Sequence, residues 1–301
     1  ERAMTVDPAD TSHAGPSDAA AIDLYMRGRH EMKEKWYSRM EPAIELYEKA
    51  LARAPDDPRI LSGLATAQAR AAFLDDPNRD AHIERAAETA RRAIEQAPDW
   101  PEPHVALAMA NYNAVAFGPA LDALERALAI SPDFFRAHEL RGRILAEVGP
   151  LDEAVGHLQR TLDYNPYLYT TRWDLARAHA LLGDWEAVDA IMERDVDSDW
   201  ARVLRYAHRS RLDLWRDQPR WVDEPPPPTI PEGSFYDIFP DVHRRIVRTG
   251  TWTEADKERL EELLAHDGGN SRLLAIRYQL SVEAGARAGD LDYAAEHLEH
   301  A

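Results

Sequence analysis

Three prolines at equal intervals are the feature of this sequence that most constrains its fold. Pro98, Pro132 and Pro166 lie 34 residues apart, and each follows a stretch whose apolar residues recur at helical spacing. A proline stops a helix because it has no backbone N–H to donate and because it disfavours helical geometry in the residue before it. A constant interval of this length indicates an internal repeat of two antiparallel helices and two turns.

A fourth copy of the pattern ends at Pro55, which lies 43 residues before Pro98, or one period plus nine. We place the nine extra residues in a loop insertion within the polar stretch from Asp75 to Asp80. Small residues such as Ala120 and Gly142 are expected where the two helices of a hairpin touch. A single hairpin cannot bury its own apolar face, so the repeats must stack. The sequence therefore predicts an all-α fold, an α-solenoid of antiparallel helix pairs with a concave inner face.

These repeats resemble the tetratricopeptide repeat (TPR) family, whose pattern asks for small residues at its eighth, twentieth and twenty-seventh positions, a bulky one at the twenty-fourth and Pro at the thirty-second. The repeat that ends at Pro132 meets all five positions, and the one that ends at Pro166 has Thr161 in place of one small residue. A fifth repeat begins near Tyr169 and degenerates at Val188. The resemblance spans roughly residues 19–200 and implies a TPR superhelix that binds a protein or peptide and has no catalytic activity.

The first repeat supports a narrower resemblance. DLYMRGRHEM at residues 23–32, followed by PAIELYEKALARAPDD at 42–57, is similar to the start of the C-terminal TPR array of bacterial multidomain regulators. In those proteins the array follows a Ser/Thr kinase or a winged-helix domain. The resemblance implies a regulatory or docking role in signalling. Because the first residue is Glu1, we expect the sequence to be part of a longer protein.

We expect four regions along the chain. Residues 1–17 form a flexible lead-in, 18–218 the array of about five repeats, 219–236 a proline-rich linker, and 237–301 a helical segment that ends in a partial TPR-like hairpin. The linker contains four consecutive prolines, Pro225 to Pro228, which can form neither a helix nor a central strand. This segment should therefore be extended.

Charge and composition exclude several kinds of partner. The chain carries 54 acidic and 36 basic residues, for a net charge of -18. Such a field repels nucleic-acid phosphates and anionic lipids, so we expect neither nucleic acid nor a membrane as partner. No apolar run reaches the roughly 18 residues needed to cross a bilayer. The absence of Cys is compatible with a reducing compartment, and we expect the protein to be cytoplasmic.

The sequence contains no recognisable catalytic constellation. It has no phosphate-binding Gly-rich loop, no H-E-x-x-H and no G-x-S-x-G, so we expect no enzymatic activity, no catalytic residue and no cofactor. Asp195, Asp197 and Asp199 open like a calcium loop. However, Trp200 stands where Gly should make the sharp turn, and Tyr206 where Glu should close the site. We interpret the segment as a solvated loop that caps a helix, and we predict no metal site.

Two histidines recur at the repeat interval. His104 and His138 lie 34 residues apart, at the same position of successive repeats. They either line one wall of the inner face or serve in packing and hydrogen bonding. Equivalent positions in adjacent hairpins can be too far apart to share a metal ion, which disfavours a metal site.

The inner face is the candidate binding surface. The resemblance implies that the second, fifth, ninth and twelfth positions of each first helix point inward, and these positions hold five Arg against two acidic residues, Glu102 and Glu139. A locally basic face in an acidic protein suits a ligand that carries carboxylates, through the bidentate geometry of Arg. We expect Arg143 and Arg177 to form the centre, with Trp173 beside them. The full candidate set is Arg29, Arg59, Met109, Tyr112, Arg136, Arg143, Trp173 and Arg177.

Two other interpretations stay open. The arginines can simply pair with acidic neighbours on a solvated face. The chain can also be a sensor, in which a short peptide or small ligand tightens the superhelix and controls an attached effector. A clamp for chaperone tails, which uses Lys and Asn in this family, is not predicted, since Asn111 and Asn113 are present without the lysines.

Overall fold

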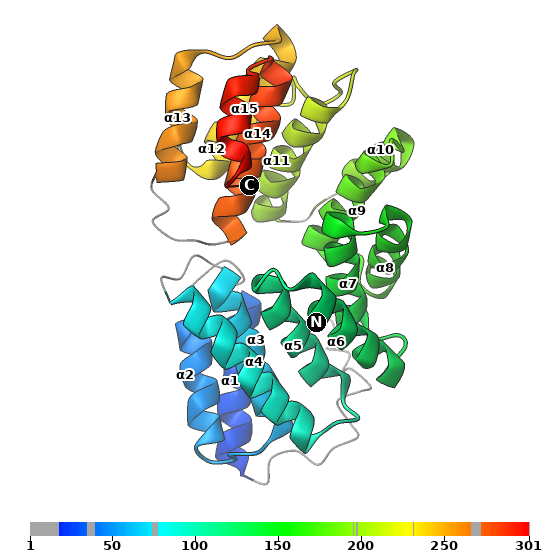
Figure 1. Ribbon diagram of the computed structural model, residues 1–301, viewed down its shortest axis with the longest axis vertical. Coiled ribbons are helices and arrows are strands. Elements are labelled where there is room, and N and C mark those ends of the chain that lie inside the picture. Colours follow the sequence, from blue (N-terminus) through cyan, green and yellow to red (C-terminus); the bar gives the residue numbers. More distant parts are fainter. Residues whose placement is uncertain are drawn as a thin grey trace. The chain divides into compact units, whose positions relative to one another are not determined.

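The computed structural model of the chain describes residues 18–34, 40–73, 78–194, 196, 198–230, 232–265 and 272–300. Over these ranges the regular structure is entirely helical, without a strand (Figure 1). The predicted all-α fold is confirmed. The helices are α1 (Ala19–Glu34), α2 (Glu41–Leu51), α3 (Pro58–Phe73), α4 (Arg79–Gln96), α5 (Pro101–Asn113), α6 (Phe117–Ile130), α7 (Phe135–Val148), α8 (Leu151–Tyr164), α9 (Tyr169–Leu181), α10 (Trp185–Met192), α11 (Asp199–Trp215), α12 (Phe235–Thr249), α13 (Glu254–Ala265), α14 (Arg272–Ala288) and α15 (Leu291–Leu298).

The repeat interval appears directly in the ends of the helices. Helices α4, α6 and α8 end at Gln96, Ile130 and Tyr164, each two residues before one of the equally spaced prolines. The repeat core follows the same phase, since Ala120 and Leu124 of α6 are both fully buried. The phase inferred from the prolines is therefore confirmed. The degenerate fifth repeat has a second helix, α10, of only 8 residues.

The nine-residue insertion is only partly a loop. Helices α3 and α4 have 16 and 18 residues, whereas α5 and α6 of the next hairpin have 13 and 14. Most of the insertion therefore extends helices, which the many Ala, Arg and Glu residues of this stretch favour. Residues 74–77 between the two helices lie outside the described ranges, as do the expected lead-in at 1–17 and both Asp195 and Asp197 of the calcium-like loop.

The helices form two compact units, α1–α6 and α7–α15. In the first unit the hairpins are α1/α2, α3/α4 and α5/α6, and α5 packs on both helices of the hairpin before it. In the second unit the hairpins are α7/α8, α9/α10, α11/α12 and α14/α15, with α13 between the last two. The division at residues 130 and 131 falls inside the expected array of 18–218.

Close helix contacts occur where a large side chain meets a glycine. In the first unit the ring of Tyr47 lies over Gly28 and Gly63, so close that an added Cβ would stand 2.9 and 2.7 Å from it. In the second unit Leu158 fills the same role against Gly142, where a Cβ would meet its Cγ at 2.7 Å. Small residues at helix crossings, as predicted for Gly142, thus set the spacing of the hairpins.

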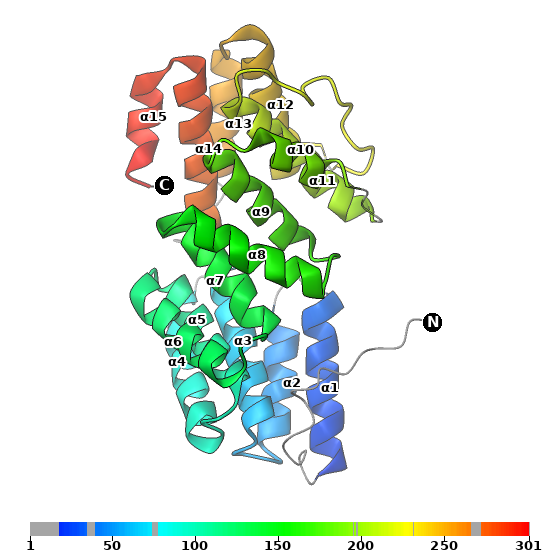
Figure 2. The same ribbon diagram turned by 90° about the vertical axis from the view of Figure 1, so that its right-hand side faces the viewer.

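The proline-rich segment joins two helices that pack against each other. Helices α11 and α12 form a hairpin, and the long connection between them runs outside it (Figure 2). Its first part is held by Asp213, whose buried carboxylate accepts the backbone N–H groups of Arg220 and Trp221 at 2.8 and 2.7 Å. Arg209 binds Glu224 at 2.8 Å, immediately before the four prolines. The helices on either side of residues 219–236 thus share one unit.

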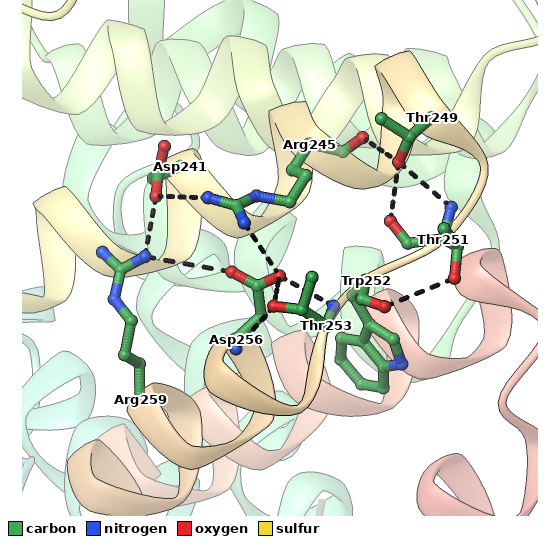
Figure 3. A network of polar contacts seen from close by, with 8 residues as sticks. All are labelled: Asp241, Arg245, Thr249, Thr251, Trp252, Thr253, Asp256 and Arg259. Atoms are coloured by element: carbon green, nitrogen blue, oxygen red, sulfur yellow. Dashed lines mark hydrogen bonds and ion pairs between the residues drawn. The ribbon is translucent and has the colours of Figure 1, made fainter.

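The turn between α12 and α13 is fixed by a reciprocal cap (Figure 3). Thr253 donates its backbone N–H and its hydroxyl to the Asp256 carboxylate at 2.9 and 2.7 Å, and the Asp256 N–H returns a bond to the hydroxyl at 3.3 Å. Arg245 of α12 lies 3.4 Å from the same carboxylate, which is 2% exposed. This arrangement is a capping box, and it ties the start of α13 to α12.

Candidate functional site

Three arginines stand at the repeat interval on successive first helices of the second unit. Arg143 of α7, Arg177 of α9 and Arg211 of α11 are each 34 residues apart. We call these three residues the arginine row. Arg143 and Arg177 were predicted as the centre of the site, whereas Arg211 lies beyond the recognisable repeats and was missed, although the interval alone would have found it.

The two outer members of the row are neutralised by carboxylates. Arg143 Nε lies 3.0 Å from Asp174 Oδ2, and its Nη2 lies 3.5 Å from Glu139 Oε1. Arg211 binds Glu283 of α14 through two parallel bonds, of 2.8 Å from Nε and 2.6 Å from Nη2. Trp215 Nε1 donates a third bond to Glu283 at 3.0 Å. These pairs link α7 to α9 and α11 to α14.

The central member, Arg177, differs from both. Among the residues that the structure describes, no hydrogen bond or ion pair reaches its guanidinium, and its Nε is buried without an acceptor. Burial and the repulsion of Arg211 lower the pKa of Arg177, and the fields of Asp174, Glu147 and Glu283 only partly offset them. Asp174 and Glu283 are already bonded to the other two arginines. The row therefore contains one largely buried cation to which the described residues supply no partner of its own.

Trp173 is buried and does not offer a free surface. It is 3% exposed and stacks on His208 of α11, with ring centroids 4.9 Å apart and an angle of 18° between the planes. Tyr169 also stacks on Trp173, with ring centroids 6.1 Å apart. Burial, together with Arg211 and Arg177, lowers the pKa of His208 to about 3, so this imidazole is neutral near pH 7. Trp173 therefore positions a neutral His next to Arg177.

The other candidate residues lie in different surroundings. Arg136, in the second unit, is exposed and lies 5.7 Å over the ring of Phe135. The remaining four belong to the first unit: Arg29 is exposed, Arg59 and Met109 are partly buried, and Tyr112 is 5% exposed. The structure thus brings together Arg143, Trp173 and Arg177 of the candidate set, and adds His208 and Arg211 to them.

The repeated histidines bond to the turns between repeats. His104 Nε2 lies 3.3 Å from the carbonyl of Pro98, and His138 Nε2 lies 2.8 Å from the carbonyl of Pro132. At the next interval Arg172 donates to the carbonyl of Pro166 at 2.7 Å. A side chain at this position therefore satisfies the carbonyl of the proline six residues earlier. The hydrogen-bonding interpretation holds for both histidines.

Neither a metal centre nor a membrane span is recognisable in the described part of the chain. No group of three or more His, Asp or Glu side chains is close enough there to hold an ion. None of the helices in these ranges is long and apolar enough to cross a bilayer.

Comparison with known proteins identifies the fold. No protein-family model matches the chain, and no curated protein matches it either. Among solved structures, TTC0263, a thermophilic TPR protein of Thermus thermophilus, is 21% identical over 63% of this chain and 98% of its own, with a TM-score of 0.52. MamA of Desulfovibrio magneticus RS-1 is 17% identical, over 58% of this chain and 95% of its own (TM-score 0.42). YrrB, a TPR protein with an unusual peptide-binding site, is 17% identical over 57% and 83% (TM-score 0.37). The fold is that of a TPR α-solenoid.

Proposed function

We propose that the chain is a non-catalytic binding module, which holds an acidic segment of another protein or a peptide at the arginine row of its second unit. The observation that carries this proposal is Arg177, a largely buried guanidinium for which the described part of the chain supplies no counter-ion of its own. Removing a cation from water is costly unless a partner compensates. A ligand carboxylate can meet the guanidinium through two parallel hydrogen bonds.

The neighbours of Arg177 favour an anion over any other ligand. Arg211 repels Arg177, and an incoming carboxylate relieves this repulsion. His208 is neutral and can donate a hydrogen bond without adding a charge. The long-range field of the chain opposes an acidic ligand, because the net charge is -18. Binding should therefore depend on the local contacts and be of modest affinity.

The role of this binding within a larger protein follows from the narrower resemblance. The similarity of residues 23–57 to the first repeat of regulator arrays supports docking in a signalling protein. One observation favours the sensor alternative: the arginine row spans α7, α9 and α11, so neutralising Arg177 would draw neighbouring hairpins closer. Small-angle scattering separates the two roles, because a sensor becomes more compact when an acidic peptide is added, whereas a docking module keeps its radius of gyration.

The test of the binding site uses a defined probe. A fluorescein-labelled octapeptide of glutamate should bind the chain in an anisotropy titration, and Arg177→Gln should weaken this binding about tenfold or more, as expected for the loss of charge-assisted hydrogen bonds. Arg177→Lys keeps the charge but not the paired geometry, so its affinity for the peptide should lie between those of the unmodified chain and of Arg177→Gln.

The matched control is Arg160→Gln, since Arg160 is exposed on the second helix α8 and is expected to leave binding unchanged. The glutamine octapeptide should not bind. An equal loss at Arg160 and Arg177, or equal binding of the two peptides, would contradict a carboxylate site at the row.

A further inference from the structure

Internal hairpins bury one apolar residue at a fixed distance from the start of the second helix. Leu158 follows the N-cap Pro150 of α8 by eight residues and is 0% exposed. Met192 follows the N-cap Asp184 of α10 by eight residues and is 1% exposed. Leu158 fills the seam between the two helices of its hairpin, against Gly142, and Met192 holds the same repeat position.

The last hairpin leaves the same position uncovered. Asp290 caps α15 by accepting the N–H three residues on, as Asp184 does in α10. Eight residues later Leu298 is 62% exposed, although its counterparts are buried. Leu291 is 68% exposed on the same side of the helix, with the exposed Ala295 between them. In Figure 2 α15 lies at the margin of its unit, beside α14. We call Leu291, Ala295 and Leu298 the α15 face.

The first helix carries the complementary surface. Ile22 and Met26 stand one turn apart on α1 and are 41% and 44% exposed. By repeat position, the counterpart of Met26 in α5 is Ala106, which is 1% exposed and packs on Ala65 and Ala90 of the preceding hairpin. Helix α1 thus exposes, at Met26, the side through which a first helix docks on the hairpin before it, and Ile22 extends this exposed apolar surface by one turn. We call Ile22 and Met26 the α1 face.

The charges around the two faces have opposite signs. Arg27, Arg29 and His30 are exposed on α1, next to the α1 face, while Asp23 pairs with Arg27. Asp292, Glu296 and Glu299 are exposed on α15, next to the α15 face. Two α15 faces would set acid against acid, and two α1 faces would set Arg against Arg. Charge therefore favours contact between unlike faces.

We propose that copies of this chain associate head to tail, the α15 face of one copy docking on the α1 face of the next. The contact repeats the geometry by which a first helix packs on the preceding hairpin inside each unit, and it buries four large apolar side chains that are otherwise in water. Such a contact joins different surfaces, so a pair of copies held by one contact keeps one free face of each kind, to which a further copy can add. The net charge of -18 on each copy opposes long rows.

The test uses the whole chain and two blocked variants in sedimentation velocity near physiological salt. The average mass of the unmodified protein should rise with concentration. Met26→Glu blocks the α1 face and Leu298→Glu the α15 face, and each variant alone should sediment as a monomer. Mixed in equal amounts, the variants should form heterodimers and nothing larger, because each supplies one intact face. Both positions are exposed, so circular dichroism should show unchanged helix content.

Val148→Glu is the matched control, since Val148 is 52% exposed but lies on neither face, and it should associate like the unmodified chain. A monomer at all concentrations overturns the proposal. Dimers of Met26→Glu or Leu298→Glu alone also overturn it, because they require a contact between like faces. Neither variant alters the arginine row, so the result is independent of the peptide-binding test.

Discussion

Single residues set the distance between the helices of a hairpin. At Gly142 of α7 there is no room for a side chain, because Leu158 of α8 occupies the space. The Cγ and the backbone N of Leu158 lie 2.7 and 3.1 Å from where a Cβ of residue 142 would stand. Gly156, nearby on α8, has nothing within 4 Å of the same construction. The two glycines have the same chemistry but opposite surroundings, and so their substitution should have opposite effects.

Gly142→Ala should lower the free energy of unfolding of the second unit by about 1–2 kcal/mol, because overpacking outweighs the gain in helix propensity. Gly156→Ala should raise it by about 0.5–1 kcal/mol, since alanine restricts the unfolded chain and meets no neighbour. Urea unfolding followed by circular dichroism measures both. If the two changes have the same sign, the α7–α8 crossing is wrongly described.

At the scale of helices, the sequence predicts those helix ends that recur with the repeat. The ends of α4, α6 and α8 follow from three prolines, because a proline ends a helix through its own backbone chemistry, whatever the surrounding fold. The start of α12 does not follow from pattern: the helical segment was expected from residue 237, yet α12 begins at Phe235, within the expected linker, and contains the buried Pro240. Its pairing with α11 depends on contacts between segments distant in sequence, which no local pattern records.

The candidate site was likewise predictable from the sequence only in part. Its arginines could be located by counting residues, but their partners could not. Arg143 was expected at the centre of the site, yet it is neutralised by Asp174, 31 residues further on, and Arg211 by Glu283, 72 residues further on. The distinction between a paired and an unpaired arginine depends on these distant carboxylates, and it selects Arg177.

The connection between α11 and α12 should depend on one buried carboxylate. Asp213→Ala removes the acceptor of two backbone N–H groups, those of Arg220 and Trp221, and leaves them without a partner. An unsatisfied buried donor costs about 1–3 kcal/mol, and of the two groups the Trp221 N–H is buried, so the second unit should lose about 1–3 kcal/mol of stability and the connection should become sensitive to protease. Asp217→Ala, on an exposed neighbour, should change stability by less than about 0.5 kcal/mol. Equal stability of the two variants would contradict this role.

At the scale of the whole molecule, three histidines of the second unit are held neutral. Burial is the main cause in each, lowering the pKa of His157 to about 4, of His208 to about 3 and of His243 to about 4. Repulsion by arginines adds to burial. Arg141 and Arg160 act on His157, and Arg211 and Arg177 act on His208. Arg211 also acts on His243, where Glu283 acts in the opposite sense.

Hydrogen bonds around His157 require its neutral form. Arg141 Nε donates to His157 Nε2 at 3.2 Å, so this nitrogen must be an acceptor and the proton must sit on Nδ1. The Nδ1 atoms of His157 and His138 are 2.6 Å apart, and His138 Nε2 lies 2.8 Å from the Pro132 carbonyl. The bonds therefore run in one direction, from Arg141 through both rings to the carbonyl. Protonation of His157 at Nε2 would set two donors against each other and break the chain of bonds.

Acid should therefore destabilise the second unit well above the pKa of its carboxylates. Because the folded pKa of each histidine lies below the usual 6.5, the unfolded chain binds more protons between about pH 6.5 and 4, and stability must fall as pH decreases through this window. The slope is on the order of 1 kcal/mol per pH unit for each buried histidine, and smaller for the half-buried His157.

Urea unfolding at pH 7.5 and pH 5 measures the effect. His243→Gln, at a fully enclosed position, should reduce the difference in the free energy of unfolding between the two pH values. The exposed His300 provides the control, since His300→Gln should leave the pH dependence unchanged. Equal stability at both pH values would mean that the folded histidines take up protons as readily as the unfolded ones, which burial next to Arg211 and Arg141 does not permit.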